Sequence, residues 1–138
     1  MDEFISDIVK VNRNAEQIYN LMADMSFFSQ MATAAPIREI EDFQSTQDTC
    51  SFKVQGTEVG IQIIDREPYK TIKYTGYKYV PVEFFVWLQL KEIASDDTRV
   101  RIVLRAKLNL MMKTLLKGKI KKGLDKIVHQ ISDSLNRS

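Results

Sequence analysis

The chain has 138 residues, the length of a single domain, and no linker or repeat divides it. Hydrophobic residues make up 44% of it and charged residues 28%, which excludes a disordered or fibrous protein. The net charge is only +2, and we expect no nucleic-acid partner.

The amino-terminal residues and the cysteine content predict a cytoplasmic protein. The amino terminus is acidic and has no long apolar run, so neither a signal peptide nor a membrane span is predicted. Cys50 is the only cysteine and can form no internal disulfide bond, which agrees with a reducing compartment.

A strand and two short helices are predicted before residue 37. Apolar residues between 4 and 11 indicate a strand, irregular because they do not alternate cleanly with polar ones. Asn14 and Gln17 have the spacing of a capping box, which begins an amphipathic helix. Ser26 is expected to cap a second helix, which Pro36 ends.

In the middle of the chain, apolar and polar residues alternate with a period of two. This pattern is typical of strands with one buried face and one solvent-exposed face. Turn signals such as Gly56 and Pro68 separate the segments. Six further strands are predicted, over residues 37–43, 50–55, 59–63, 71–76, 82–91 and 99–110.

A long amphipathic helix is predicted from Leu110 to the end, with Asn109 as its cap. Its apolar residues recur at spacings of three and four: Leu116, Ile120, Leu124, Ile127, Val128, Ile131 and Leu135. We expect this helix to pack across one face of the sheet and cover it.

The first half of this helix departs from the simple pattern. Lys113 and Lys117 fall close to the line of the later apolar stripe, at about 100° per residue. Gly118 and Gly123 each cost about 1 kcal/mol relative to alanine inside a helix. We therefore expect the first turns to bend or rotate near Gly118.

Charge is also distributed unevenly. From Leu110 onward there are seven basic and two acidic residues, so this part carries +5 and the rest of the chain −3. A basic helix can attract anionic lipid, an acidic ligand or nucleic acid. The simpler interpretation is a solvated helix face.

The order of these elements resembles the START-like, or SRPBCC, superfamily, which includes the birch-pollen allergen family, polyketide cyclases and lipid-transfer domains. The stretch from Val11 to Asp24 is similar to the opening of many members, where a strand enters the first helix through a short polar cap. The resemblance covers residues 1–138 as one domain. It implies an α+β helix-grip fold: a seven-stranded curved antiparallel sheet, two short helices between its first and second strands, and a long C-terminal helix packed across it. It also implies a hollow between helix and sheet that often accepts an apolar or aromatic small molecule.

The sequence offers no catalytic motif. His129 is the only histidine, and its helical neighbours Asp125 and Asp133 place it on a polar stripe facing water. Cys50 lies in an apolar register and is interpreted as a core residue. Without a phosphate loop or metal-ligand spacing, we expect no catalytic residue, no cofactor and no metal.

The apolar inner face is the candidate binding site, since apolar walls with a few polar groups are typical of small-molecule pockets. Either a filled core or a ligand-sized pocket fits the large side chains. The expected lining consists of Phe52, Ile61, Ile63, Ile72, Tyr74, Phe84, Val86, Leu88, Ile102, Leu104, Ala106, Met112, Leu116 and Ile120.

The pocket entrance is predicted at Tyr77, Tyr79, Lys113 and Lys117. An ammonium group there would favour a carboxylate or phosphate on an otherwise apolar ligand. The alternative is that both lysines extend into water.

Phe85 and Trp87 are predicted on the outer face of the sheet, beside Arg101 and Arg105. Stacking of an arginine on the indole would cover them within one chain. Alternatively, they form a patch that pairs two copies as a homodimer.

These observations favour binding, transport or sequestration of a hydrophobic or amphipathic small molecule or lipid, rather than catalysis. One alternative is an enzyme of the polyketide cyclase or dehydratase type that uses Tyr74, the one polar residue expected on the inner face. Another is an interaction module that recognises a protein or membrane surface through the basic helix or the Trp87 face.

Overall fold

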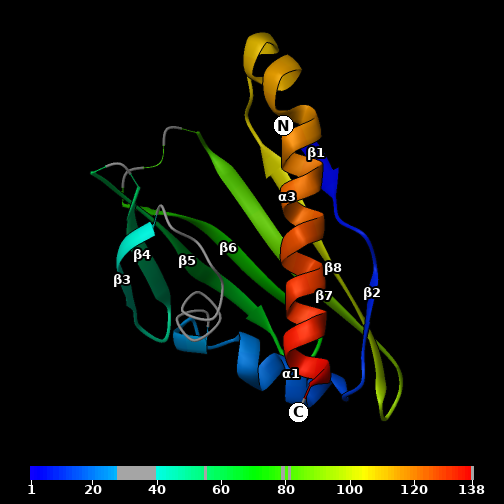
Figure 1. The fold of residues 1–138 in the computed structure, drawn as a ribbon. Helices are drawn as coiled ribbons and strands as arrows, with labels where there is room; N and C mark the ends of the chain where they lie inside the picture. The colour runs from blue at the N-terminus through cyan, green and yellow to red at the C-terminus, as the bar shows by residue number, and fades with distance from the viewer. Residues whose placement is uncertain (28–39, 55, 79, 81, 138) are drawn as a thin grey trace.

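The structure is a computed structural model, and it describes residues 1–27, 40–54, 56–78, 80 and 82–137. It has the predicted α+β fold, with a curved antiparallel sheet, a short helix near the amino terminus and a long C-terminal helix across the sheet (Figure 1). The helices are α1 (Ala15–Met22) and α3 (Leu110–Asn136). The strands are β1 (Asp2–Ile5), β2 (Val9–Val11), β3 (Ile40–Ser45), β4 (Thr49–Val54), β5 (Thr57–Glu67), β6 (Thr71–Lys78), β7 (Phe84–Ala94) and β8 (Asp97–Ala106).

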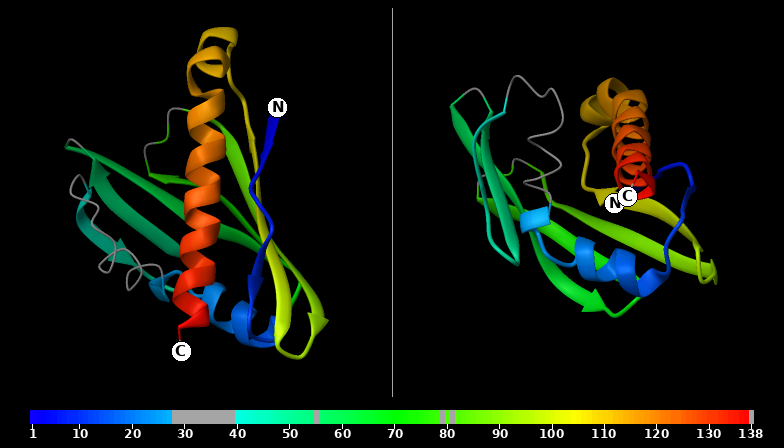
Figure 2. Two further views of the ribbon diagram at one scale, coloured as in Figure 1. Left: turned by 45° about the vertical axis from the view of Figure 1, so that its right-hand side comes forward. Right: turned by 60° about the horizontal axis from the view of Figure 1, so that its bottom comes forward.

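The sheet is a meander of β3 to β8, and the amino-terminal strands are added at the β8 edge. Its strand order is β1-β8-β7-β6-β5-β4-β3, and β2 also pairs with β8. All pairs are antiparallel, and the strands from β3 to β8 that follow one another in the chain are neighbours in the sheet. The sheet curves around the side on which α3 lies, and α1 lies at one end of it (Figure 2).

The first strand is divided, which corrects the prediction of one strand in this place. Ile5 pairs with Val103, and Val9 pairs with Val100. Three residues therefore lie between the pairs on the amino-terminal side but only two lie between them on β8, so the amino-terminal segment has one extra residue. Ser6 forms this irregularity: its N–H donates to the Ile102 carbonyl (2.9 Å), and its hydroxyl accepts from the Ile102 N–H (2.8 Å). The described sheet therefore has eight strands instead of seven.

The capping box of the first helix is confirmed. The Asn14 side chain accepts from the Gln17 N–H (2.8 Å), and the Gln17 side chain accepts from the Asn14 N–H (3.3 Å). The expected cap of the second helix differs, because Ser26 donates both its N–H and its hydroxyl to the carboxylate of Asp24. Most of that predicted helix falls on residues 28–39, outside the described residues.

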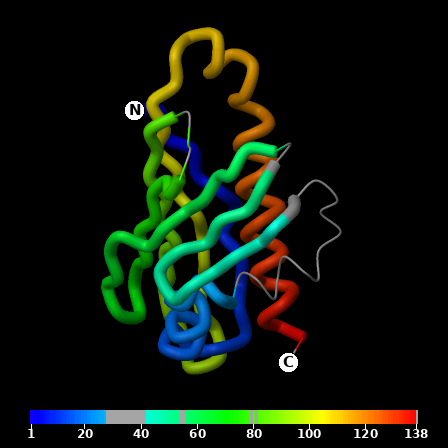
Figure 3. Tube along the Cα trace, turned by 90° about the vertical axis from the view of Figure 1, so that its left-hand side faces the viewer, coloured from blue at the N-terminus to red at the C-terminus, as the bar shows by residue number. Residues whose placement is uncertain are grey.

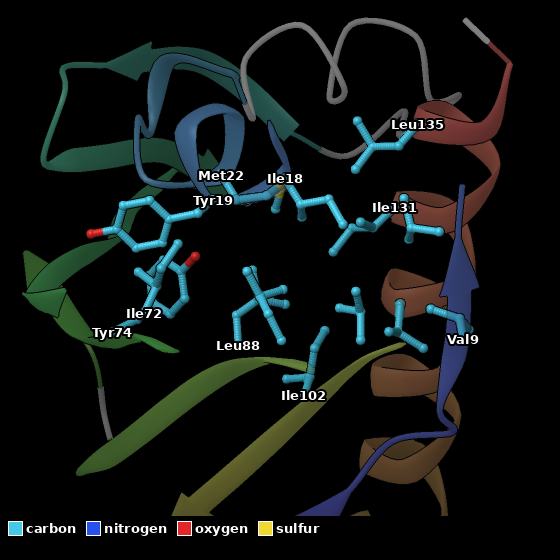
Figure 4. Close-up of a cluster of buried hydrophobic side chains, with 14 of the residues drawn as sticks. Val9, Ile18, Tyr19, Met22, Ile72, Tyr74, Leu88, Ile102, Ile131 and Leu135 are labelled. Atoms are coloured by element: carbon cyan, nitrogen blue, oxygen red, sulfur yellow. The ribbon is translucent and has the colours of Figure 1, made fainter. Parts of the chain in front are cut away.

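The core is closed where α1, the sheet and the second half of α3 meet. Ile18 of α1, Ile72 of β6 and Ile131 of α3 are each at most 1% exposed, and their side chains converge (Figure 4). Leu124, Val128 and Leu135 extend the same stripe of α3, as predicted. Ile127 is 44% exposed, however, so it lies on the flank of the stripe.

α3 runs as one continuous helix through both of its glycines. A Cβ atom added at Gly118 or Gly123 would meet nothing within 4 Å. Packing therefore does not require either glycine, and each lowers the helix propensity without a compensating contact.

Gly118→Ala and Gly123→Ala are each expected to stabilise the protein by about 1 kcal/mol, because alanine restricts the unfolded chain and favours the helix. Urea unfolding monitored by circular dichroism measures the change. Gly60→Ala is the control with the opposite sign: its Cβ would lie 2.7 Å from the Cys50 carbonyl oxygen and 2.9 Å from that of Tyr77. A loss of stability at Gly118 would show that this position needs glycine.

Candidate functional site

The predicted inner-face residues of the sheet do face inward, but they are buried to different degrees. Ile63, Ile72, Tyr74, Leu88, Ile102 and Ala106 are buried. Phe52, Ile61, Phe84, Val86 and Leu104 are only half-buried. From α3, Met112, Leu116 and Ile120 are half-buried as well.

The degree of burial of these residues depends on which helices lie over them. Ile72, Leu88 and Ile102 lie under α1 and the second half of α3, where the core is closed (Figure 4). We call the remaining apolar group the open half of the inner face. It consists of Phe52, Ile61, Val86, Leu104 and Ile120, all half-buried and all packed against the core.

The open half extends across several strands. Val86 of β7 pairs directly with Leu104 of β8 on one side and with Tyr74 of β6 on the other. Phe52 of β4 stacks on Phe43 of β3, with ring centroids 6.0 Å apart. The members of the group therefore spread over β4, β5, β7, β8 and α3, and each keeps part of its apolar surface accessible.

The lysines of the first half of α3 explain why its apolar stripe shifts. Lys113 Nζ lies 2.9 Å from Asp2, and Lys121 Nζ lies 3.2 Å from Asp7 and 2.8 Å from Asp125. In its second half, this side of α3 packs on apolar residues. In its first half, the same side faces the acidic amino-terminal segment that contains Asp2 and Asp7. Lysines therefore replace leucine and isoleucine on that line.

The predicted entrance residues are placed in different surroundings. Lys113 is paired with Asp2, whereas Lys117 is exposed and forms no ion pair within the described residues. Tyr77 is half-buried, with the Lys78 ammonium 5.2 Å from its ring centroid. Tyr79 lies outside the described residues. Their role at an entrance stays a prediction.

His129 is exposed, as predicted, but it contacts a carboxylate from another part of the chain. Its Nε2 lies 3.0 Å from Asp7 Oδ2, and the Asp7 N–H donates to Asp125 (2.7 Å). With Lys121, these residues form a polar clasp between the amino-terminal segment and α3. Hydrogen bonds from His129 and Lys121 lower the pKa of Asp7.

Asp7→Asn is expected to lower stability near pH 5, and that loss should fade by about pH 2. A carboxyl group whose pKa is lowered in the folded state stabilises the fold above its unfolded pKa, and that contribution disappears as the pH falls through the folded pKa. Urea unfolding across this pH range measures the effect. Asp133→Asn is the matched control, since Asp133 lies one helical turn from His129 yet forms no ion pair among the described residues. Equal effects of the two substitutions would show that the clasp contributes nothing specific.

Two buried groups on the sheet remain protonated. Burial raises the pKa of Tyr74 well above its ordinary value, and burial raises the pKa of Cys50 to about 11. The phenol can therefore donate a hydrogen bond but is not available as a base near neutral pH, and the thiol is not a ready nucleophile. The interpretation of Cys50 as a core residue is confirmed, since it is 4% exposed.

A surface groove of about 1080 Å³ lies elsewhere, near α1 and the β7–β8 hairpin. Its lining combines apolar residues, among them Leu90 and Val100, with charged and polar ones. Several of these groups already bond to one another, such as the Arg101 Nε to Gln89 (2.6 Å). None of the residues predicted to bind a ligand lines this groove.

The outer face has its own cation–aromatic cluster. Lys73 Nζ lies 4.8 Å from the ring centroid of Phe85 and 5.2 Å from that of Trp87, and the Arg105 guanidinium lies 5.7 Å from Trp87. The predicted covering of the indole by an arginine of the same chain is confirmed. Pairing of two copies through Phe85 and Trp87 stays a prediction.

Within the described residues, no group of three or more histidine, cysteine, aspartate or glutamate side chains is placed to hold a metal ion. No described helix is long and apolar enough to cross a membrane.

No protein-family model and no curated protein matches the sequence. Solved structures do match. Norcoclaurine synthase from Thalictrum flavum, in complex with dopamine and hydroxybenzaldehyde, is 9% identical with a TM-score of 0.74, over 99% of this chain and 84% of that one. A conserved protein from Geobacillus kaustophilus is 15% identical with a TM-score of 0.70, over 100% of this chain and 97% of that one.

A protein from Thermobifida fusca is 13% identical with a TM-score of 0.71, over 99% of this chain and 95% of that one. At these identities the likeness establishes the fold, which covers the chain from end to end. Function has to be argued from the site itself.

Proposed function

We propose that this protein is a member of the START-like superfamily that binds a hydrophobic or amphipathic small molecule between the sheet and α3. The observation that carries the proposal is the open half of the inner face. Five apolar side chains there pack on the core and still keep accessible surface. An apolar ligand would remove that surface from water, which contributes roughly 25 cal/mol for each Å² buried.

The surroundings of the open half support an amphipathic ligand. Tyr74, which pairs with Val86, is itself buried, so the accessible surface beside it is apolar. Lys117 is the exposed ammonium of the predicted entrance that has no ion pair among the described residues. A ligand with an apolar body and an acidic group would match the apolar surface and this ammonium group.

A structural neighbour points in the same direction. Norcoclaurine synthase has this fold and is in complex with dopamine and hydroxybenzaldehyde, which are small aromatic molecules. The open half of the present protein offers apolar contact, and burial raises the pKa of Tyr74 so far that its phenol is not a base near neutral pH. Binding is therefore favoured over a cyclase-type reaction.

Native mass spectrometry of gently purified protein tests the proposal. We expect a bound small molecule that denaturation releases and that organic extraction recovers as an apolar or amphipathic compound. Bare protein that also takes up no apolar probe would contradict the proposal. Turnover of the recovered compound would instead favour the enzyme alternative.

A further inference from the structure

The first turns of α3 carry apolar side chains that the fold leaves exposed. Leu110 is 82% exposed, Met111 72% and Leu115 65%, the highest values among the large hydrophobic residues of the protein that the structure describes. This part of the helix extends past the edge of the sheet (Figures 1 and 3). The three residues form a protruding apolar tip, and leaving it in water is unfavourable.

Lysines continue the outer face of the helix that carries Met111 and Leu115. At about 100° per residue, Met111, Leu115, Lys119, Lys122 and Lys126 fall within one sector about 80° wide. All five are exposed, and none of the three lysines forms an ion pair within the described residues. They differ in this respect from Lys113 and Lys121, which point toward the amino-terminal segment and are paired there.

The face has little negative charge to offset these lysines. Residues 110–123 include five lysines and no acidic residue. The first carboxylate along the outer sector is Asp133, two turns beyond Lys126. Asp2 and Glu3, which lie on β1, are paired with Lys113 and Arg105. The outer sector is therefore an apolar tip followed by an uncompensated basic strip.

We propose that this face docks the protein on an anionic lipid bilayer. Met111 and Leu115 would enter the boundary between headgroups and acyl chains, and Lys119, Lys122 and Lys126 would contact lipid phosphates and carboxylates. Apolar residues with flanking lysines on one exposed helix face have the chemistry of an interfacial helix. The inference goes beyond ligand binding and uses different residues from those of the open half.

A bilayer fits the face better than a protein partner does. The apolar tip is convex and small, whereas a stable protein interface buries about 800 Å² on each side, more than three side chains supply. A deformable lipid surface needs no matching groove. Each lysine held near an anionic membrane strengthens binding about fivefold.

Co-sedimentation with vesicles tests the proposal on the full chain. We expect binding to vesicles of phosphatidylcholine mixed with phosphatidylserine, little binding to phosphatidylcholine alone, and release at high salt. The combined variant Met111→Ser/Leu115→Ser should lose most of the binding. The variant Lys119→Glu/Lys122→Glu/Lys126→Glu should bind more than about a hundredfold more weakly, because three attractive charges become repulsive.

Matched controls lie at the other end of the sheet, near the β7–β8 hairpin (Figure 2). Ile93 is 60% exposed and Lys91 is exposed, so Ile93→Ser and Lys91→Glu make the same chemical changes away from the tip. Both controls should bind vesicles as the unmodified protein does. Thermal unfolding of all variants verifies that they remain folded.

Three outcomes would overturn the proposal. The first is no sedimentation with either vesicle type, and the second is binding that the tip and lysine variants leave unchanged. The third is a concentration-dependent dimer, seen by analytical ultracentrifugation without lipid, that Met111→Ser/Leu115→Ser abolishes. That result would assign the face to contact between copies of the chain.

Discussion

Replacing Ile131 with alanine is expected to lower the free energy of unfolding by about 3 kcal/mol. Ile131 is 1% exposed and points from α3 toward α1 and the sheet (Figure 4). The substitution removes apolar contacts and leaves a cavity between three elements. Fixed polar contacts near the same end of α3 limit collapse around that cavity: Ser132 and Asn136 both donate to the Lys10 carbonyl, at 2.9 and 3.1 Å.

Ile127→Ala is the matched control for this substitution. It deletes the same atoms from the same helix, but Ile127 is 44% exposed and contributes less to the core. Its cost should stay below about 1 kcal/mol. Urea unfolding with a two-state fit measures both values. Similar losses at the two positions would mean that the packed side of α3 is not the one that carries Ile131.

The fold could be predicted because its signals are local and repeated. Leu88 and Leu90 alternate with Gln89 and Lys91, and a similar alternation holds for Val100 and Ile102, so a period of two assigned them to the inner face. Asn14 and Gln17 supplied a complete helix start within four residues. Such patterns fix the type and side of an element without knowledge of distant contacts.

The division of the first strand could not be predicted in the same way. The irregular spacing of its apolar residues was visible, but its cause is a pair of hydrogen bonds between Ser6 and Ile102, 96 residues apart. A serine that replaces one ladder contact with its hydroxyl has no distinctive local pattern. Only the pairing with β8 identifies the extra residue.

The lysines on the packed line of α3 needed the same kind of long-range information. Lys113 looked misplaced in the sequence because its partner, Asp2, lies more than 100 residues away, and the pairing of Lys121 with Asp7 spans a similar separation. One signal could have found them. The amino-terminal segment is acidic while the final helix carries +5, and that complementarity suggests contact between the two.

Periodicity also cannot tell how completely a layer is covered. Leu88 and Leu104 occupy the same inner face, yet Leu88 is 2% exposed and Leu104 is only half-buried. The difference depends on where α1 and the second half of α3 lie over the sheet. For this reason the sequence left a filled core and a ligand pocket as equal alternatives, and the three-dimensional arrangement separates a closed half from an open half.

Leu104→Asp is expected to weaken binding of an amphipathic apolar probe, anilinonaphthalene sulfonate, by more than about a hundredfold. In the free protein the half-buried position leaves the new carboxylate in contact with water, so the fold should persist. A ligand seated on Val86 and Leu104 would cover that carboxylate with apolar surface and leave it without a partner. Fluorescence titration measures the dissociation constant, and thermal unfolding measures the stability.

The same substitution on the opposite side of the sheet separates site effects from general ones. Ile64 is 45% exposed on β5, so Ile64→Asp adds the same charge away from the inner face and should leave probe binding unchanged. Leu104→Trp gives a second, uncharged variant that should also reduce binding, because the larger ring occupies surface that the ligand needs. If both Leu104 variants unfold cooperatively and still bind the probe as the unmodified protein does, the ligand does not lie on the open half. In that case the partly exposed apolar side chains of the open half would not be a ligand site, and the proposed binding function would lose its main support.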